Sequence, residues 1–300
     1  MKIAYHEIYV HPLPADHRFP MVKYELIPAQ LLREGVIRPE QLFAPTALDE
    51  GSILLTHTAA YWHKLRDQQL SAREQRRIGL PQSPALTLRE ITICQGTIDV
   101  ALHALSNGLG FNVAGGTHHA FADSGEGFCL LNDFGIAANY LLHHKKVKQA
   151  LVIDLDVHQG NGTASLFEHN AHVYTFSMHG AHNYPFHKER SDWDLPLADG
   201  TDTGTYLQLL EEALPQLINR VKPDIVFYLS GVDILSTDKF GKLKVTAEGC
   251  LQRDEMVFHH LRKHDIPCAV AMGGGYSSRI RDIVNAHCNT FKAGISIYGG

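Results

Sequence analysis

The sequence lacks the features that mark several large classes of protein. It has only 5 cysteines among 300 residues, none in a Cys-x-x-Cys pair, which is typical of a reduced intracellular protein rather than a disulfide-bonded secreted one. No apolar run approaches the ~18 residues that a membrane helix needs, and the first ten residues lack the pattern of a signal peptide. We therefore expect a soluble, cytoplasmic protein without a membrane partner.

An excess of positive charge is also missing. Lys and Arg number 27 against 32 Asp and Glu, a net charge of −5, which argues against a direct nucleic-acid partner. The whole-molecule charge mildly favours a cationic partner, although it does not say where the charge lies. The balance of 44% hydrophobic and 20% charged residues excludes a disordered, collagen-like or coiled-coil chain. What stands out is 20 histidines, since histidine is the commonest metal ligand and acid–base group.

Short apolar runs alternate with amphipathic stretches along the whole chain. The runs predict strands at residues 2–5, 53–55, 111–114, 150–154, 173–177, 225–230 and 269–271. The clearest helix starts at a Thr87-x-x-Glu90 capping box and stops at Asn107-Gly108; further helices are predicted at 133–145, 205–220, 247–264 and 277–293. This alternation predicts one α/β domain over residues 1–300, with a central, mostly parallel sheet flanked by helices.

Polar residues follow two of these strands, at the edge where such sheets bind ligands. A spacing of two places Asp154, Asp156 and His158 on one side of the extended chain, and burying them there is costly unless they bind a cation or one another. Asp233 follows the strand at 225–230 and could add a third oxygen ligand. Three protein ligands leave positions open for water and a substrate carbonyl, as a catalytic zinc site requires. A solvated turn, and for Asp233 a helix cap, are the alternatives.

Other polar and aromatic residues follow strands in the same way. His118 and His119 lie in a glycine-rich turn and could exchange protons with a metal-bound water. Tyr276 ends a triple-glycine turn and could donate a hydrogen bond to an oxyanion. Phe128 and Phe186 could wall a narrow apolar slot. Taken singly, paired surface histidines, a packing tyrosine and core aromatics explain each feature as well.

Together, the segments HHAFADSGEGFCLLND, IDLDVHQGNGT, LSGVDIL and MGGGY resemble, in order and spacing, the zinc-dependent histone deacetylase family. The family includes bacterial deacetylase-like proteins and acetylpolyamine amidohydrolases, and the resemblance extends from about Lys2 to Ala293. The short chain and its HPLPADHRFPMVKYELI opening are most similar to bacterial and class IV-like members. The resemblance implies the arginase–deacetylase fold and hydrolysis of linear amides, with an acylated lysine peptide or protein, or an acetylated polyamine, as substrate.

The resemblance also implies residue roles. One Zn²⁺ ion per chain would be held by Asp156, His158 and Asp233. His119 would be the general base that takes a proton from water and then protonates the leaving amine. His118, held by Asp154, would assist electrostatically, and Tyr276 would stabilise the oxyanion.

Further residues are implied for the tunnel and for a second cation. Substrate contacts would come from Gly127, Phe128, Phe186, Gly274 and Gly275. Arg18 would belong to the inner acetate cavity. K⁺ would bind beside the zinc site, through Asp154, Asp156, His158, Ser177 and Met178.

One departure and three rivals bear on this interpretation. Asn161 stands where class I members have an aspartate, as in class II and IV members, so His119 could be less basic.

Arginase-like ureohydrolases need two further carboxylates for a manganese pair, but Gly160 and Leu235 occupy those positions. A non-catalytic acyl-lysine binder is disfavoured because Tyr276 and His119 are present. An acetylpolyamine or other small-molecule deacetylase remains a serious alternative, because its chemistry is identical.

Overall fold

Eight strands form one sheet, and every pairing between them is parallel. The computed structural model describes residues 1–299, and the sheet order is β2-β1-β3-β8-β7-β4-β5-β6. Because all strands run the same way, the loops that follow β3, β4, β7 and β8 meet at one edge. The strands are β1 (Lys2–Ala4), β2 (Leu42–Phe43), β3 (Leu109–Asn112), β4 (Ala150–Asp154), β5 (Val173–Gly180), β6 (Trp193–Leu197), β7 (Ile225–Leu229) and β8 (Cys268–Ala271).

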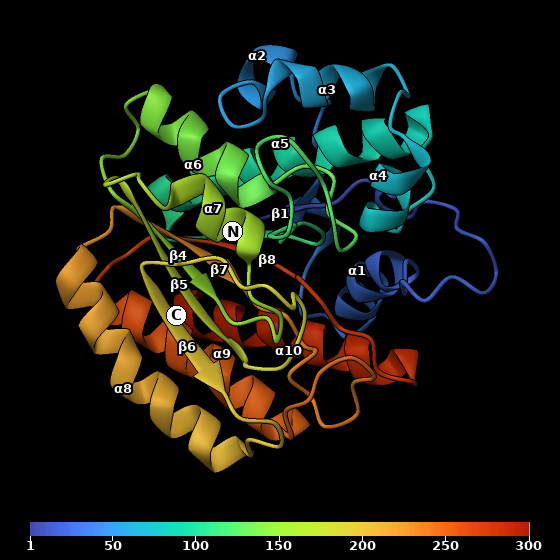
Figure 1. Ribbon diagram of the computed structural model, residues 1–300. Coiled ribbons are helices and arrows are strands. Elements are labelled where there is room, and N and C mark those ends of the chain that lie inside the picture. Colours follow the sequence, from blue (N-terminus) through green and yellow to red (C-terminus); the bar gives the residue numbers. More distant parts are fainter. Residues whose placement is uncertain (300) are drawn as a thin grey trace.

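Helices cover both faces of this sheet (Figure 1). One layer contains α8, α9 and α10, with α1 packed on α10, and the other is built around α5 and α6. The central strands β4, β7 and β8 are fully buried, as strands with helices on both faces must be. The helices are α1 (Lys23–Arg33), α2 (Glu50–Ile53), α3 (Ala59–Arg66), α4 (Ala72–Ile78), α5 (Pro84–Asn107), α6 (Asp133–His143), α7 (Asn161–Phe167), α8 (Thr203–Val221), α9 (Ala247–Lys263) and α10 (Ile280–Tyr298).

The predicted α/β architecture is confirmed, and most predicted strands recur within two residues. The strand predicted at 53–55 is wrong, because the Asp49 side chain accepts a hydrogen bond from Ser52 N (3.0 Å) and caps α2 instead. The predicted capping box is also wrong. Helix α5 begins one turn earlier, where Ser83 is the N-cap and Pro84 follows. No helix among residues 1–299 combines the length and apolarity needed to cross a membrane.

Candidate active site

Three buried donors converge from two neighbouring strand ends. Asp156 and His158 follow β4, Asp233 follows β7, and these strands are adjacent in the sheet. One ligand atom from each lies within 4.8 Å of the others. His158 Nδ1 is 2.9 Å from Asp156 Oδ1 and 3.2 Å from Asp233 Oδ2. The structure therefore brings together the three residues that the sequence grouped.

The electrostatics of this cluster favour a cation. Burial alone would lower the pKa of His158, but its hydrogen bond with Asp156 and the negative charges of Asp156 and Asp233 raise it to about 10. Burial, reinforced by the charge of Asp156, raises the pKa of Asp233 to about 7. The buried Asp233 Oδ2 accepts no hydrogen bond within residues 1–299. Two buried carboxylates that lie together, one of them with an oxygen that lacks a hydrogen-bond donor, form a site that a positive ion would stabilise.

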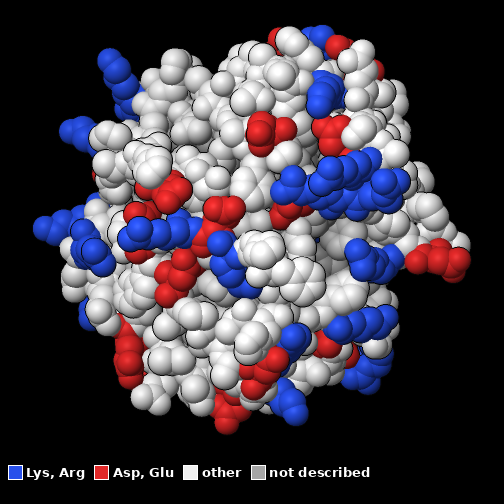
Figure 2. Space-filling view, viewed as in Figure 1, with Lys and Arg blue, Asp and Glu red and all other residues white. Residues whose placement is uncertain are grey.

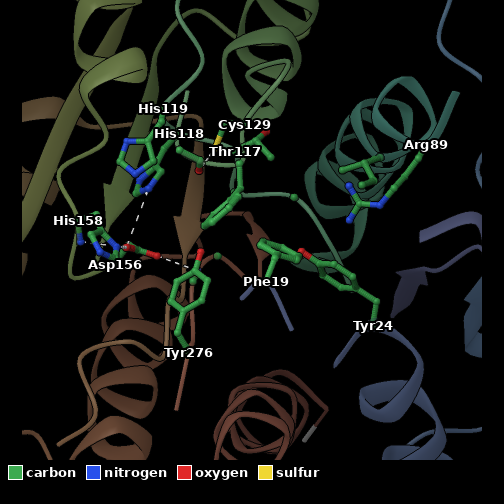
Figure 3. A pocket seen from close by; sticks show the side chains of 17 residues that line it. Phe19, Tyr24, Arg89, Thr117, His118, His119, Cys129, Asp156, His158 and Tyr276 are labelled. Carbon is green, nitrogen blue, oxygen red and sulfur yellow. Dashed lines mark hydrogen bonds and ion pairs between the residues drawn. The ribbon is translucent and has the colours of Figure 1, made fainter. Parts of the chain in front are cut away.

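Two adjacent histidines lie beside the cluster (Figure 3), and a different partner orients each of them. The rings of His118 and His119 are 4.1 Å apart between centroids. His118 Nδ1 is 2.7 Å from Asp154 Oδ2, and His119 Nδ1 is 2.7 Å from Asn161 Oδ1. Both rings therefore turn their Nε2 atoms away from these partners, and both residues line the inner cavity together with Asp156.

The surroundings shift the two histidines in opposite directions. Burial lowers the pKa of His118, but the charge and hydrogen bond of Asp154 outweigh it and raise that pKa above its usual value. Burial and the nearby charges of His118 and His158 hold the pKa of His119 well below its usual value. His119 is thus the neutral imidazole of the pair, the state that a general base requires.

Behind His119 a polar chain leads outward to the surface. Asn161 Nδ2 donates to Glu126 Oε1 (2.6 Å), and Arg77 Nε donates to Glu126 Oε2 (2.5 Å). Glu126 is buried while the Arg77 side chain is half exposed. Glu126 was not predicted from the sequence, because its only signal there is a lone carboxylate between two glycines. Such a residue is more often part of a solvated turn.

The triple-glycine turn after β8 packs directly on the metal-ligand candidates. Gly274 N donates to Asp156 Oδ2 (2.8 Å), and a Cβ added to Gly274 would lie 2.0 Å from Asp233 Oδ2. Only glycine fits there. Gly275 instead packs against Val232. It lines neither the inner cavity nor the larger outer cavity at the mouth of the site, so the structure does not support its predicted contact with substrate.

Tyr276 follows this turn with its backbone fixed and its hydroxyl facing the site. Tyr276 N donates to Asp238 Oδ2 (2.6 Å). The hydroxyl points into the inner cavity that Asp156 also lines (Figure 3). Burial and the charges of Asp156 and Asp233 raise the pKa of Tyr276 well above its usual value. The hydroxyl therefore keeps its proton and can donate a hydrogen bond.

Aromatic rings line the approach to the site. Phe128 lies between Phe19, with ring centroids 5.2 Å apart, and Tyr276, at 6.1 Å. Gly127, at φ +54°, passes so close to His119 that a Cβ there would be 2.7 Å from His119 Cδ2. This backbone course is open to glycine but strained for other residues.

The structure places two of the predicted residues at the outer mouth. Phe186 lies at the outer mouth with 89% of its surface exposed, and Tyr184 packs edge-on against His119 in its place (5.0 Å). Arg18 also lines the outer mouth rather than the inner cavity. The inner cavity, of ≈ 40 Å³, is lined by Arg89, which the sequence did not single out.

The predicted potassium residues lie in register on neighbouring strands. Asp154, at the end of β4, pairs with Ser177 of β5, and both side chains are buried. Ser177 Oγ is 3.0 Å from His179 Nδ1. Met178 is fully buried beside them.

A buried ion pair supports the loop that carries Asp233. Arg253 and Asp254 of α9 are both fully buried. Arg253 donates to Gly231 O (2.5 Å) and to Asp254 Oδ1 (2.9 Å), while Asp254 accepts from Tyr228 and Thr290.

Comparison with known proteins places this fold and site in a family. Residues 17–291 match the histone deacetylase domain. The chain is 43% identical over 296 residues to an uncharacterized protein of Picosynechococcus sp., with 99% of each covered. It is 29% identical over 289 residues to histone deacetylase 2 of Arabidopsis thaliana, covering 93% of this chain and 75% of the relative. A crystal structure of an HDAC homologue complexed with SAHA has the same fold, with TM-score 0.84 and 23% identity over 99% of this chain and 84% of the homologue.

The chain therefore belongs to the histone deacetylase family. This membership makes it a hydrolase of the deacetylase or deacylase type that acts on acylated substrates, and the converging donors form its candidate metal site.

Proposed function

We propose that this protein is a zinc-dependent deacylase that hydrolyses acylated lysine side chains. The observation that carries this proposal is the buried set of Asp156, His158 and Asp233, with one ligand atom from each within 4.8 Å of the others. It lies beside a neutral histidine and at the base of an aromatic-walled approach. An acylated lysine is uncharged and extended, so it suits such a passage.

The donor set fits zinc in number and chemistry. Two carboxylates and one imidazole are the ligand types of catalytic zinc sites, which keep further positions open. Asp233 Oδ2 is buried without a hydrogen bond within residues 1–299, as expected for an atom that ligates a metal. Zinc bound there would polarise the acyl carbonyl and lower the pKa of a water molecule.

In this proposal His119 takes the proton from water and passes it to the leaving nitrogen. Asn161 holds Nδ1 of His119, so Nε2 remains the free base. His118, whose pKa Asp154 raises against the effect of burial, adds positive charge beside the forming oxyanion. Both histidines act from fixed positions, since each Nδ1 is 2.7 Å from its partner.

Tyr276 and the aromatic walls complete the proposed roles. The protonated hydroxyl of Tyr276 would hydrogen-bond the acyl oxygen as it gains negative charge. Phe128 and Tyr184 would flank the methylene chain of the lysine, since both line the outer cavity. Gly127 lets the chain pass this close to His119.

We also propose a potassium ion next to the zinc site. Support comes from the paired, buried oxygens of Asp154 and Ser177, because potassium is bound through several oxygens that replace its hydration shell. The measurement is hydrolysis rate in potassium chloride against choline chloride at equal ionic strength. Equal rates in the two salts would count against a functional potassium site.

A substrate panel tests the proposed function. The purified chain is assayed on neutral acetyl-lysine peptides and on N-acetylspermidine, untreated, after chelation and after zinc is restored. We expect hydrolysis of the peptides that chelation abolishes and zinc restores. A zinc-loaded protein that cleaves none of the peptides would contradict the proposal, and cleavage of N-acetylspermidine alone would point to a polyamine deacetylase.

Metal content gives a second test. Asp233→Ala should remove stoichiometric zinc, because one of three protein ligands is lost. Asp123→Ala removes an exposed carboxylate instead and should retain the metal. Elemental analysis of both purified variants measures their zinc content. Full zinc retention by Asp233→Ala would rule out the assignment of Asp233 as a ligand.

A further inference from the structure

The mouth of the active-site tunnel is lined by positive charge. This outer cavity, of ≈ 580 Å³, reaches inward to His119, His158 and Tyr276. No Asp or Glu side chain within residues 1–299 lines it. Its charged lining residues are Arg18, Arg76, Arg77, Lys239 and Lys242, all exposed. The local sign is opposite to the net charge of −5, so the cationic partner suggested by whole-molecule charge does not suit this opening.

Three of these five cations have no ion-pair partner among residues 1–299. Arg77 is neutralised by Glu126, and Lys242 lies 3.6 Å from Asp199. Arg18, Arg76 and Lys239 form no ion pair within the part of the chain that the structure describes. An unpaired surplus of three positive charges therefore surrounds the entrance.

The three unpaired cations come from separate segments around the entrance. Arg76 belongs to α4, and Lys239 to the loop after β7. Arg18 precedes α1, with its guanidinium over the rings of Phe128 (5.4 Å) and Phe240 (5.5 Å). Figure 2 shows Lys and Arg side chains gathered near α4 and around a hollow in this face. Because the cations are distributed, they suit a ligand with several negative charges rather than one anion.

We infer that the substrate is an acylated lysine flanked by acidic residues. The inference rests on the proposed function, since a lysine side chain reaching His119 must leave its neighbouring residues at the mouth. A peptide with Asp or Glu near the acyl-lysine would meet Arg18, Arg76 and Lys239 there. A basic segment or a cationic acetylpolyamine would meet repulsion at the same place.

The expected preference is moderate. Each exposed ion pair changes binding by a factor of about 1.4 to 5, and three together give roughly tenfold. Such contacts also raise the rate at which enzyme and substrate associate, and they weaken as the salt concentration rises. The preference should therefore show in kcat/KM and fade as the ionic strength rises.

The test compares three acetyl-lysine peptides of equal length with Glu, Gln or Lys at the flanking positions. We expect kcat/KM to fall in the order Glu, Gln, Lys, with about tenfold between the Glu and Gln peptides at low salt and a larger gap between the Glu and Lys peptides. At about 1 M salt, where the screening length is roughly 3 Å, the peptides should converge. Equal kcat/KM for all three at low salt would overturn the inference, as would a preference for the Lys peptide.

Reversing the charge of two residues at the mouth tests whether they cause the preference for acidic peptides. In the double variant Arg76→Glu, Lys239→Glu, the ratio of kcat/KM between Glu and Lys peptides should fall below one. The control Lys146→Glu, Lys263→Glu makes the same change in net charge at exposed positions beside the amino ends of β4 and β8, and its ratio should match wild type. Each ratio is taken within one variant, so a general loss of activity cancels.

The outcomes separate this inference from the proposed function. If a zinc-loaded protein cleaves no acetyl-lysine peptide, the proposed function fails. If it cleaves all three equally, or if both double variants shift the ratio alike, only the acidic-substrate inference fails. Inhibition by an oligonucleotide without any peptide preference would overturn it in favour of a nucleic-acid ligand.

Discussion

At the scale of single residues, Glu126 decides which nitrogen of His119 is free. A carboxylate only accepts hydrogen bonds, so Asn161 must turn its amide nitrogen toward Glu126 (2.6 Å). The amide oxygen then faces His119 Nδ1 (2.7 Å) and can only accept. His119 Nδ1 therefore carries the proton, and Nε2 is the basic atom. An amide can thus fix the tautomer of this histidine as a carboxylate would.

Glu126→Ala should release this orientation and lower kcat about tenfold, with little change in KM. Without an acceptor behind it, the Asn161 amide can rotate and present a donor to His119, which favours the wrong tautomer. The matched control is Asp123→Ala, an exposed carboxylate on the same loop, and its kcat should equal wild type. Steady-state kinetics with a neutral peptide measure kcat and KM for both variants and for wild type. An unchanged kcat for Glu126→Ala would show that Asn161 needs no support.

Tyr276→Phe should lower kcat by about 10²–10³ while zinc is retained, because one donor to the oxyanion is removed. The substituted phenyl ring would keep the packing that the Tyr276 ring makes with Phe128 and Phe240. Turnover and metal content are measured on the same preparation. A variant with wild-type kcat would remove Tyr276 from the proposed reaction.

The residues that the sequence could reveal are those whose type and spacing both carry information. Asp156 and His158 alternate on one extended strand end, and Asp233 follows a second strand, so parallel topology was enough to group them. Glu126 and Arg253 act only through contacts with distant segments. No local pattern distinguishes them from surface charges, so the structure was needed to find them.

At the scale of elements, helix α9 holds the loop that carries a candidate metal ligand. Arg253 donates to Gly231 O (2.5 Å), two residues before Asp233, and pairs with Asp254 in full burial. The helix thereby ties the carboxyl end of β7 to the layer beneath it. Its contribution to the site is positional, since neither charge lines a cavity.

Arg253→Met should destabilise the fold by about 3–5 kcal/mol, because it leaves Asp254 buried without its cation. Arg262→Met, at an exposed arginine on the same helix, should stay within about 0.5 kcal/mol of wild type. Urea unfolding measures both. Equal midpoints for the two variants would mean that the buried pair does not hold α9 to the sheet.

Elements with a strong hydrophobic periodicity were predictable from the sequence, whereas elements whose position depends on tertiary contacts were not. The buried strand at 150–154 and helix α9 begin where the sequence indicates. Strand β2 has two residues, and β6 is a half-exposed edge strand that contains a proline, so neither shows a continuous apolar run. Helix α1 contains Pro28, and helices α3 and α4 are only 8 and 7 residues long, so their formation depends on packing against the rest of the chain.

At the scale of the whole molecule, buried neutral histidines make stability depend on pH. Burial lowers the pKa of His57 and of His179 to about 4. His57 lies away from the candidate metal ligands, and its Nε2 accepts a hydrogen bond from Asn132 N (3.0 Å). An unfolded chain protonates such a histidine from about pH 6.5 downward, whereas the folded chain does so only near pH 4.

His57 therefore stabilises the fold fully above pH 6.5, and its contribution falls as the pH drops from about 6.5 to about 4. Between pH 7 and 5 the loss should be about 2 kcal/mol for this group alone. His57→Gln keeps an acceptor for Asn132 N but cannot ionise, so its free energy of unfolding should decline less over that interval. His63→Gln, at a half-exposed position, should decline as wild type does. Urea unfolding of the three proteins at both pH values measures the slopes, and parallel slopes for wild type and His57→Gln would show that His57 is not held neutral by the fold.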